Sequence, residues 1–106
     1  MNPTEQLIAA LSSLPGVVQK KSRFTSDGNM AWVIAGREFA HLHSSCLLDL
    51  RLPRAAQAGL RQDPRAHFRR HSSAWLELEF HTAADAADLL ALARQAAAAA
   101  KQDREK

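Results

Sequence analysis

The sequence has a single cysteine and no long apolar run, and each absence excludes a class of protein. Cys46 alone cannot form an internal disulfide or a zinc site built from several cysteines, which fits a reducing compartment. The chain lacks the roughly 18 consecutive apolar residues of a membrane span. Its N-terminus also lacks the basic start of a secretory signal. We therefore expect a cytoplasmic protein that does not contact a membrane.

The chain is short and has the composition of a folding domain. Its 106 residues suit one hydrophobic core and exclude a multidomain enzyme. Hydrophobic residues make up 46% and charged residues 24%, so most of the chain should pack rather than stay a solvated coil. We predict one domain over residues 1–100 and a frayed, charged tail over residues 101–106.

Signals for the start of a helix stand near both ends of the chain. Asn2 and Glu5 have the spacing of a capping box, and apolar residues follow at helical spacing as far as Leu14. Thr82 and Asp85 form an aspartate variant of the same box. The helix that they start carries an apolar stripe of Ala86, Leu89, Leu90, Ala93 and Ala97.

Between these helices, alternating apolar and polar residues predict strands. The clearest is 74–80, where Trp75, Glu77 and Glu79 lie on the face opposite the apolar positions. Further strands are expected at 17–24, 30–35, 38–43 and 48–52, with tight turns at Asp27-Gly28 and Gly36-Arg37.

A short helix is expected from Pro53 to Arg61, which gives the order α-β-β-β-β-α-β-α. Strands joined in hairpins, with helices set apart from them, are typical of the α+β class. We predict an antiparallel sheet of four to five strands with the N- and C-terminal helices packed on one face.

The middle of the chain resembles a known signature. Residues 37–43, Arg-Glu-Phe-Ala-His-Leu-His, followed by Asp49 and Pro53, are similar to the Arg-Glu-x-x-His-x-His and Asp-x-x-x-Pro signature of a small uncharacterised family labelled "luciferase domain". His67 and the Ser-x-Trp that ends at Trp75 also match. Bacterial members are short chains without an assigned reaction, so the resemblance implies a fold and does not establish light emission.

A looser likeness is to the YjbR-type proteins, which have a frataxin-like α+β fold. It rests on residues 14–17, on residues 36–40, and on the series Pro64, His67 and Trp75. Those proteins are often described as DNA-binding on structural analogy, so the likeness implies a fold more strongly than a function.

His41 and His43 are two residues apart, so on a strand their side chains point to one face about 7 Å apart. Two imidazoles at this spacing can share a metal ion or an anion. With Cys46 they form an incomplete set of metal ligands, and no cofactor is expected.

The turn after the second histidine allows two strand registers. A two-residue turn over residues 44–45 places His41 opposite Leu48, at the edge of the core. A three-residue loop over residues 44–46 instead places His41 opposite Asp49, whose carboxylate would then hold one tautomer of the ring. The second register is favoured, because the family signature includes the aspartate and has a loop of three residues.

Trp75 is expected on the face opposite the core, beside Glu77. As an exposed platform it could stack a ring while nearby arginines hold an anionic group. Alternatively, the arginine-rich loop folds back and covers the indole by guanidinium stacking.

These features predict a ligand-binding or interaction module without catalysis. Its imidazoles would exchange hydrogen bonds with a small anionic or aromatic ligand, an aspartate would orient one ring, and arginines would neutralise charge. The predicted surface consists of His41, His43, Asp49, Arg51, His67, Arg70 and Trp75. Monomer and homodimer are both compatible with the sequence.

Two other classes of function stay open at this point. In a hydrolase-like or metal-assisted enzyme, His41 would be the general base, with His43 beside it and Asp49 orienting it. In a weak nucleic-acid-binding protein, the basic segment Arg54–Arg70 would contact phosphates. The net charge of +3 permits such attraction without forming a dense basic arm.

Overall fold

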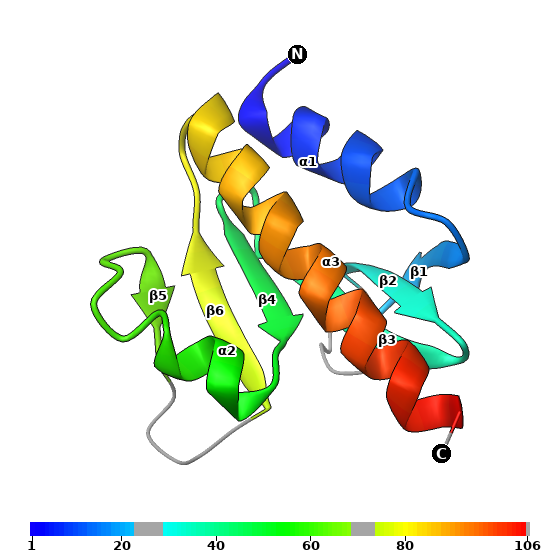
Figure 1. Cartoon of the computed structure of the whole chain (residues 1–106). Helices are drawn as coiled ribbons and strands as arrows, with labels where there is room; N and C mark the ends of the chain where they lie inside the picture. The colour runs from blue at the N-terminus through cyan, green and yellow to red at the C-terminus, as the bar shows by residue number, and fades with distance from the viewer. Residues whose placement is uncertain (23–28, 69–73, 106) are drawn as a thin grey trace.

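The computed structural model describes residues 1–22, 29–68 and 74–105. They form a six-stranded antiparallel sheet in the order β1-β2-β3-β4-β6-β5, and the two long helices lie side by side on one of its faces (Figure 1). In chain order the elements are α1 (Pro3–Ser12), β1 (Val17–Lys21), β2 (Met30–Ile34), β3 (Arg37–Ser44), β4 (Leu47–Arg51), α2 (Arg54–Ala58), β5 (Ala66–His67), β6 (Trp75–Glu79) and α3 (Ala83–Glu105).

The predicted α+β class and the position of both terminal helices on one face are confirmed. The sheet exceeds the predicted four to five strands because Ala66–His67 pairs with β6 as the short strand β5. Helix α3 continues to Glu105, and the division into a domain over residues 1–100 and a frayed tail stays a prediction. The predicted turn at Asp27-Gly28 lies outside the described residues.

Both long helices begin at the predicted caps. Asn2 Oδ1 accepts the backbone N–H of Glu5 at 2.8 Å, and the Glu5 carboxylate accepts that of Asn2 at 3.3 Å. At the start of α3, Thr82 Oγ1 accepts the N–H of Asp85 at 3.0 Å, and the Asp85 carboxylate accepts that of Thr82 at 3.2 Å. Each box satisfies backbone donors that have no partner within the helix. Among the helices in the described ranges, none has the length and apolarity needed to cross a bilayer.

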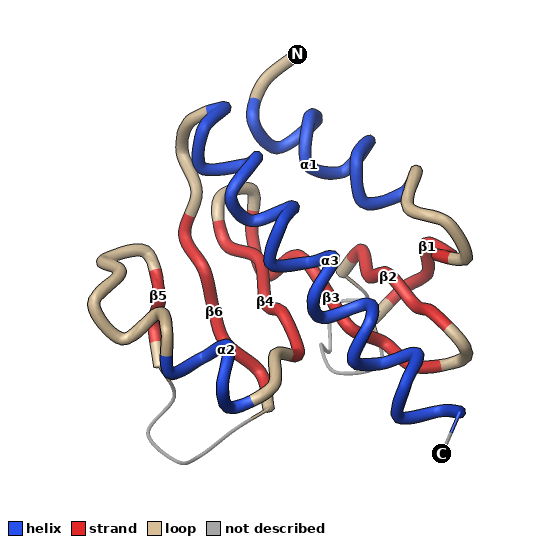
Figure 2. Tube along the Cα trace, in the orientation of Figure 1, coloured by secondary structure: helices blue, strands red, loops and turns tan. Residues whose placement is uncertain are grey.

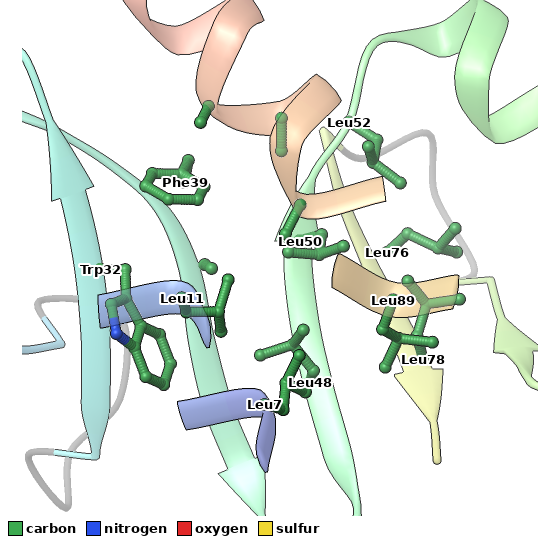
Figure 3. Close-up of a cluster of buried hydrophobic side chains, with 14 of the residues drawn as sticks. Leu7, Leu11, Trp32, Phe39, Leu48, Leu50, Leu52, Leu76, Leu78 and Leu89 are labelled. Carbon is green, nitrogen blue, oxygen red and sulfur yellow. The ribbon is translucent and has the colours of Figure 1, made fainter. Parts of the chain in front are cut away.

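Helices α1 and α3 lie over one face of the sheet (Figure 2), and the buried hydrophobic side chains lie between them and the sheet (Figure 3). Leu7 and Leu11 on α1 and Leu89 on α3 are at most 1% exposed. Trp32 on β2 is fully buried, and its indole N–H donates to Ser12 Oγ at 3.0 Å. The strand residues that complete the core are Phe39, Ala40, Leu48, Leu50, Leu76 and Leu78. We call the opposite side of the sheet the second face. The helices do not cover it, so polar side chains can lie there.

A β-bulge in β3 changes which side chains share a face. Ala40 pairs with the residue before Val33, and Val33 pairs with Glu38, so Phe39 is an extra residue in the strand. Phe39 lies in the core (Figure 3), as does its neighbour Ala40, although neighbours in a regular strand point to opposite faces. As a result, Glu38 and His41 share the second face although they are three residues apart.

The turn between β2 and β3 holds two residues in the left-handed region, Ala35 at φ 52° and Gly36 at φ 79°. Two-residue hairpin turns with positive φ at both positions favour Asn-Gly, because a Cβ is strained there. A Cβ added at Gly36 would meet nothing within 4 Å, so substitution there would strain only the backbone.

We expect Ala35→Asn to raise the free energy of unfolding by about 0.5–1 kcal/mol, because asparagine adopts left-handed backbone more readily than alanine. Gly36→Ala should lower it by about 1 kcal/mol through the same strain. Equilibrium unfolding in urea measures both changes. Shifts of the same sign for the two substitutions would contradict this account of the turn.

Candidate functional site

Strand alternation and the bulge bring ionisable and aromatic side chains together on the second face. They come from β3, β4 and β6, which are neighbours in the middle of the sheet. They are Glu38, His41, His43, Asp49, Trp75 and Glu77.

His41 is the centre of a buried cluster. Its Nδ1 lies 3.0 Å from Glu38 Oε2, and its Nε2 lies 2.8 Å from Asp49 Oδ2. The side chains of His41, Glu38 and Asp49 are 4%, 4% and 1% exposed. Ser22 Oγ donates to the same Glu38 oxygen at 2.7 Å. Each nitrogen of the ring thus lies within hydrogen-bond distance of a buried carboxyl group. We call Glu38, His41 and Asp49 the acid–histidine–acid cluster.

The indole of Trp75 covers this cluster. Its ring centroid lies 4.6 Å from that of His41, with the two planes tilted by 44°. An aromatic ring at this distance shields the imidazole from water. A ligand would have to displace Glu38 or Asp49 to reach a nitrogen of His41. The geometry therefore suits a residue that positions its neighbours.

The β3–β4 register places His41 opposite Asp49, as the three-residue loop predicts, but the turn itself differs. The turn holds two residues, 45 and 46, and His43 is the extra residue of a second bulge in β3. The His43 ring is 53% exposed, and its Nδ1 lies 3.7 Å from Asp49 Oδ2 and 3.8 Å from Glu77 Oε2. The strand therefore presents one buried and one exposed imidazole to the same aspartate.

The other predicted site residues lie elsewhere. His67 is on β5, at the edge of the sheet, with Nε2 3.0 Å from Glu79 Oε1. Hydrogen bonds from His81 and then from His67 lower the pKa of Glu79. Cys46 lies in the β3–β4 turn, and its Sγ is 3.8 Å from Ser44 Oγ. Arg70 lies outside the described residues.

A basic pocket of about 180 Å³ opens beside the cluster. Glu38 belongs to both the pocket wall and the cluster, and Arg51 is the predicted site residue that lines the pocket. We call this cavity the basic pocket; its lining residues are Lys20, Lys21, Val33, Gly36, Arg37, Glu38 and Arg51.

Sequence reasoning missed Lys20, Lys21 and Arg37 as site residues. Lysines on a strand are usual on a solvated sheet edge, and β1 is an edge strand. Arg37 is the first residue of the family signature, and its place in that signature could have identified it as a candidate site residue.

Arg65, in the basic middle of the chain, is held by three aspartates. Its guanidinium lies 2.9 Å from Asp63, 2.9 Å from Asp85 and 3.0 Å from Asp88. These bonds tie the loop before β5 to the first turns of α3. The positive charge of Arg65 is therefore balanced within the protein, which gives no support to a phosphate-binding role for this residue.

An antiparallel sheet with two helices on one face and an acid–histidine–acid cluster on the other defines a small α+β domain. Residues 36–96 match the family model of the Luciferase domain, and the chain belongs to this family. The matched region contains the whole cluster and its covering indole. No curated protein and no solved structure matches the chain. The likeness to YjbR-type proteins stays a prediction.

The Arg65 contacts predict a pH dependence of stability. Side-chain hydrogen bonds from Arg65 lower the pKa of Asp63 from 3.8 to about 2. A carboxyl whose pKa is lower in the folded state stabilises the fold above about pH 4, and this contribution is lost as the pH falls toward about 2. We expect Asp63→Asn to lower the free energy of unfolding by about 1–2 kcal/mol at neutral pH, and by almost nothing near pH 2. Urea unfolding of both proteins across this range measures the difference, and a deficit that does not change with pH would count against the assignment.

Proposed function

We propose that the protein is a non-catalytic binding module for a small anionic ligand, and that the basic pocket holds the anionic group. The observation that carries this proposal is the convergence of Lys20, Lys21, Arg37 and Arg51 on one cavity from β1, β3 and β4. Cations set around one cavity repel one another, and a bound anion relieves that repulsion. Glu38, the acid in the wall, is already bonded to His41.

The pocket volume limits the class of ligand. Pockets for drug-sized molecules typically measure about 300–1,000 Å³, whereas this one measures about 180 Å³. It therefore suits a single compact group such as a carboxylate or a phosphate. Arg51 lies directly opposite Trp75 in the β4–β6 pairing, so an apolar or aromatic part of the ligand can rest against the indole.

The enzyme alternative has weaker geometric support. A general base must come within hydrogen-bond reach of the proton that it removes. Both nitrogens of His41 are bonded to buried carboxylates, and Trp75 lies against the ring. We assign His41 a positioning role: it holds Glu38 in the wall of the basic pocket.

An NMR titration of the protein with inorganic phosphate, and separately with benzoate, tests the proposal. We expect saturable shifts of the backbone amides of Lys20, Arg37 and Arg51. Arg51→Gln should raise Kd at least about tenfold, because a charge-assisted hydrogen bond is lost. Arg94→Gln is the matched control, since it removes the same charge from an exposed position on α3. Binding should also weaken as salt is added.

Equal effects of the two substitutions would indicate general electrostatic attraction and would contradict a specific pocket. The absence of saturable shifts with both anions up to about 20 mM would contradict the proposal as well.

A further inference from the structure

A second group of side chains on the second face has the geometry of a metal site. His43 Nδ1 and one carboxylate oxygen each from Asp49 and Glu77 all lie within 4.8 Å of one another. The three residues come from β3, β4 and β6, which are adjacent in the sheet. We infer that these side chains bind a divalent transition-metal ion. The site shares no residue with the lining of the basic pocket.

The distances between these atoms suit a bound ion. Zinc–nitrogen and zinc–oxygen bonds of about 2.0–2.2 Å place the ligand atoms of a tetrahedral site about 3.4 Å apart. His43 Nδ1 lies 3.7 Å from Asp49 Oδ2 and 3.8 Å from Glu77 Oε2. Both distances exceed the tetrahedral value by only a few tenths of an ångström, and the two carboxylate oxygens lie within 4.8 Å of each other, so closing around an ion also brings Glu77 toward Asp49. The side chains of His43 and Glu77 are 53% and 26% exposed, so they have the freedom to make these movements.

The strand register gives a separate reason for a cation at this place. Asp49 lies directly opposite Glu77 in the β4–β6 pairing. Like charges directly opposite each other destabilise an antiparallel pair. Because Asp49 is 1% exposed, solvent screens the repulsion poorly. A divalent ion between the two carboxylates converts this repulsion into attraction.

The acid–histidine–acid cluster supports the most buried ligand. Asp49 Oδ2 lies 2.8 Å from His41 Nε2. A carboxylate oxygen has two lone pairs, so it can accept this hydrogen bond and bind a metal ion at the same time. Glu38 in turn fixes the other nitrogen of His41. Outer hydrogen bonds of this kind orient metal ligands and strengthen binding.

The ligand set also selects the type of ion. Magnesium and calcium prefer sites made of oxygen atoms, whereas an imidazole combined with carboxylates suits zinc, manganese, iron or cobalt. Three protein ligands leave at least one coordination position for water, and the exposed His43 ring places that position toward solvent.

Titration calorimetry with Zn²⁺ on the untagged protein, stripped beforehand with EDTA, tests this inference. We expect one ion per chain, and an absorption band in the visible range when Co²⁺ replaces Zn²⁺. His43→Ala and Glu77→Gln should each raise Kd at least about tenfold. His67→Ala is the matched control, because it removes an exposed imidazole that lies beside a glutamate at the sheet edge, and it should leave Kd unchanged.

The inference is overturned if Zn²⁺ does not bind, if His67→Ala weakens binding as much as His43→Ala does, or if equimolar Mg²⁺ displaces the Zn²⁺. The His43→Ala variant should still bind phosphate, since His43 does not line the basic pocket. This result distinguishes a failure of the metal site from a failure of the basic pocket.

Discussion

The position of His41 between two buried carboxylates constrains the whole second face. A buried carboxylate costs several kcal/mol unless an opposite charge and hydrogen bonds compensate for its lost hydration. Glu38 and Asp49 each hydrogen-bond one nitrogen of the same ring. The bulge at Phe39 allows Glu38 to lie on the same face as His41, because a regular strand would point Glu38 toward the leucines of the core.

The cluster connects two surfaces of opposite charge. On one side, Glu38 forms part of the wall of the basic pocket, among lysines and arginines. On the other side, Asp49 faces His43 and Glu77, where a cation is favoured. The cluster lies within the region matched by the Luciferase domain family, whereas Lys20 and Lys21 come from β1, outside it. The family match therefore covers the cluster but not the two lysines that line the basic pocket.

Much of the fold could be predicted because its signals are local. Two capping boxes mark the helix starts, and strict alternation in β6 places Trp75 and Glu77 on the second face. The pairing of His41 with Asp49 was predicted from the family signature, which includes the aspartate, although the expected three-residue loop is a two-residue turn with a bulge at His43.

The rest of the site could not be predicted, for physical reasons. No glycine or proline marks the bulge at Phe39, so the link between Glu38 and His41 is invisible in a pattern of period two. His67 is separated from His41 because β5 pairs with the edge of β6 that faces away from β4. This pairing depends on tertiary packing and not on the local sequence. The basic pocket combines residues far apart in the sequence, and each of its lysines by itself is typical of a solvated edge.

A double-mutant cycle between His41 and Asp49, followed by urea unfolding, tests most directly whether the buried contact between these two side chains organises this face. His41→Gln alone should lower the free energy of unfolding by about 3 kcal/mol or more, because it removes the ring that hydrogen-bonds two buried carboxyl groups. The loss should be smaller in the Asp49→Asn background, with an interaction energy of at least about 1 kcal/mol. Additive losses, within about 0.5 kcal/mol, would show that the two side chains act independently and would contradict the account.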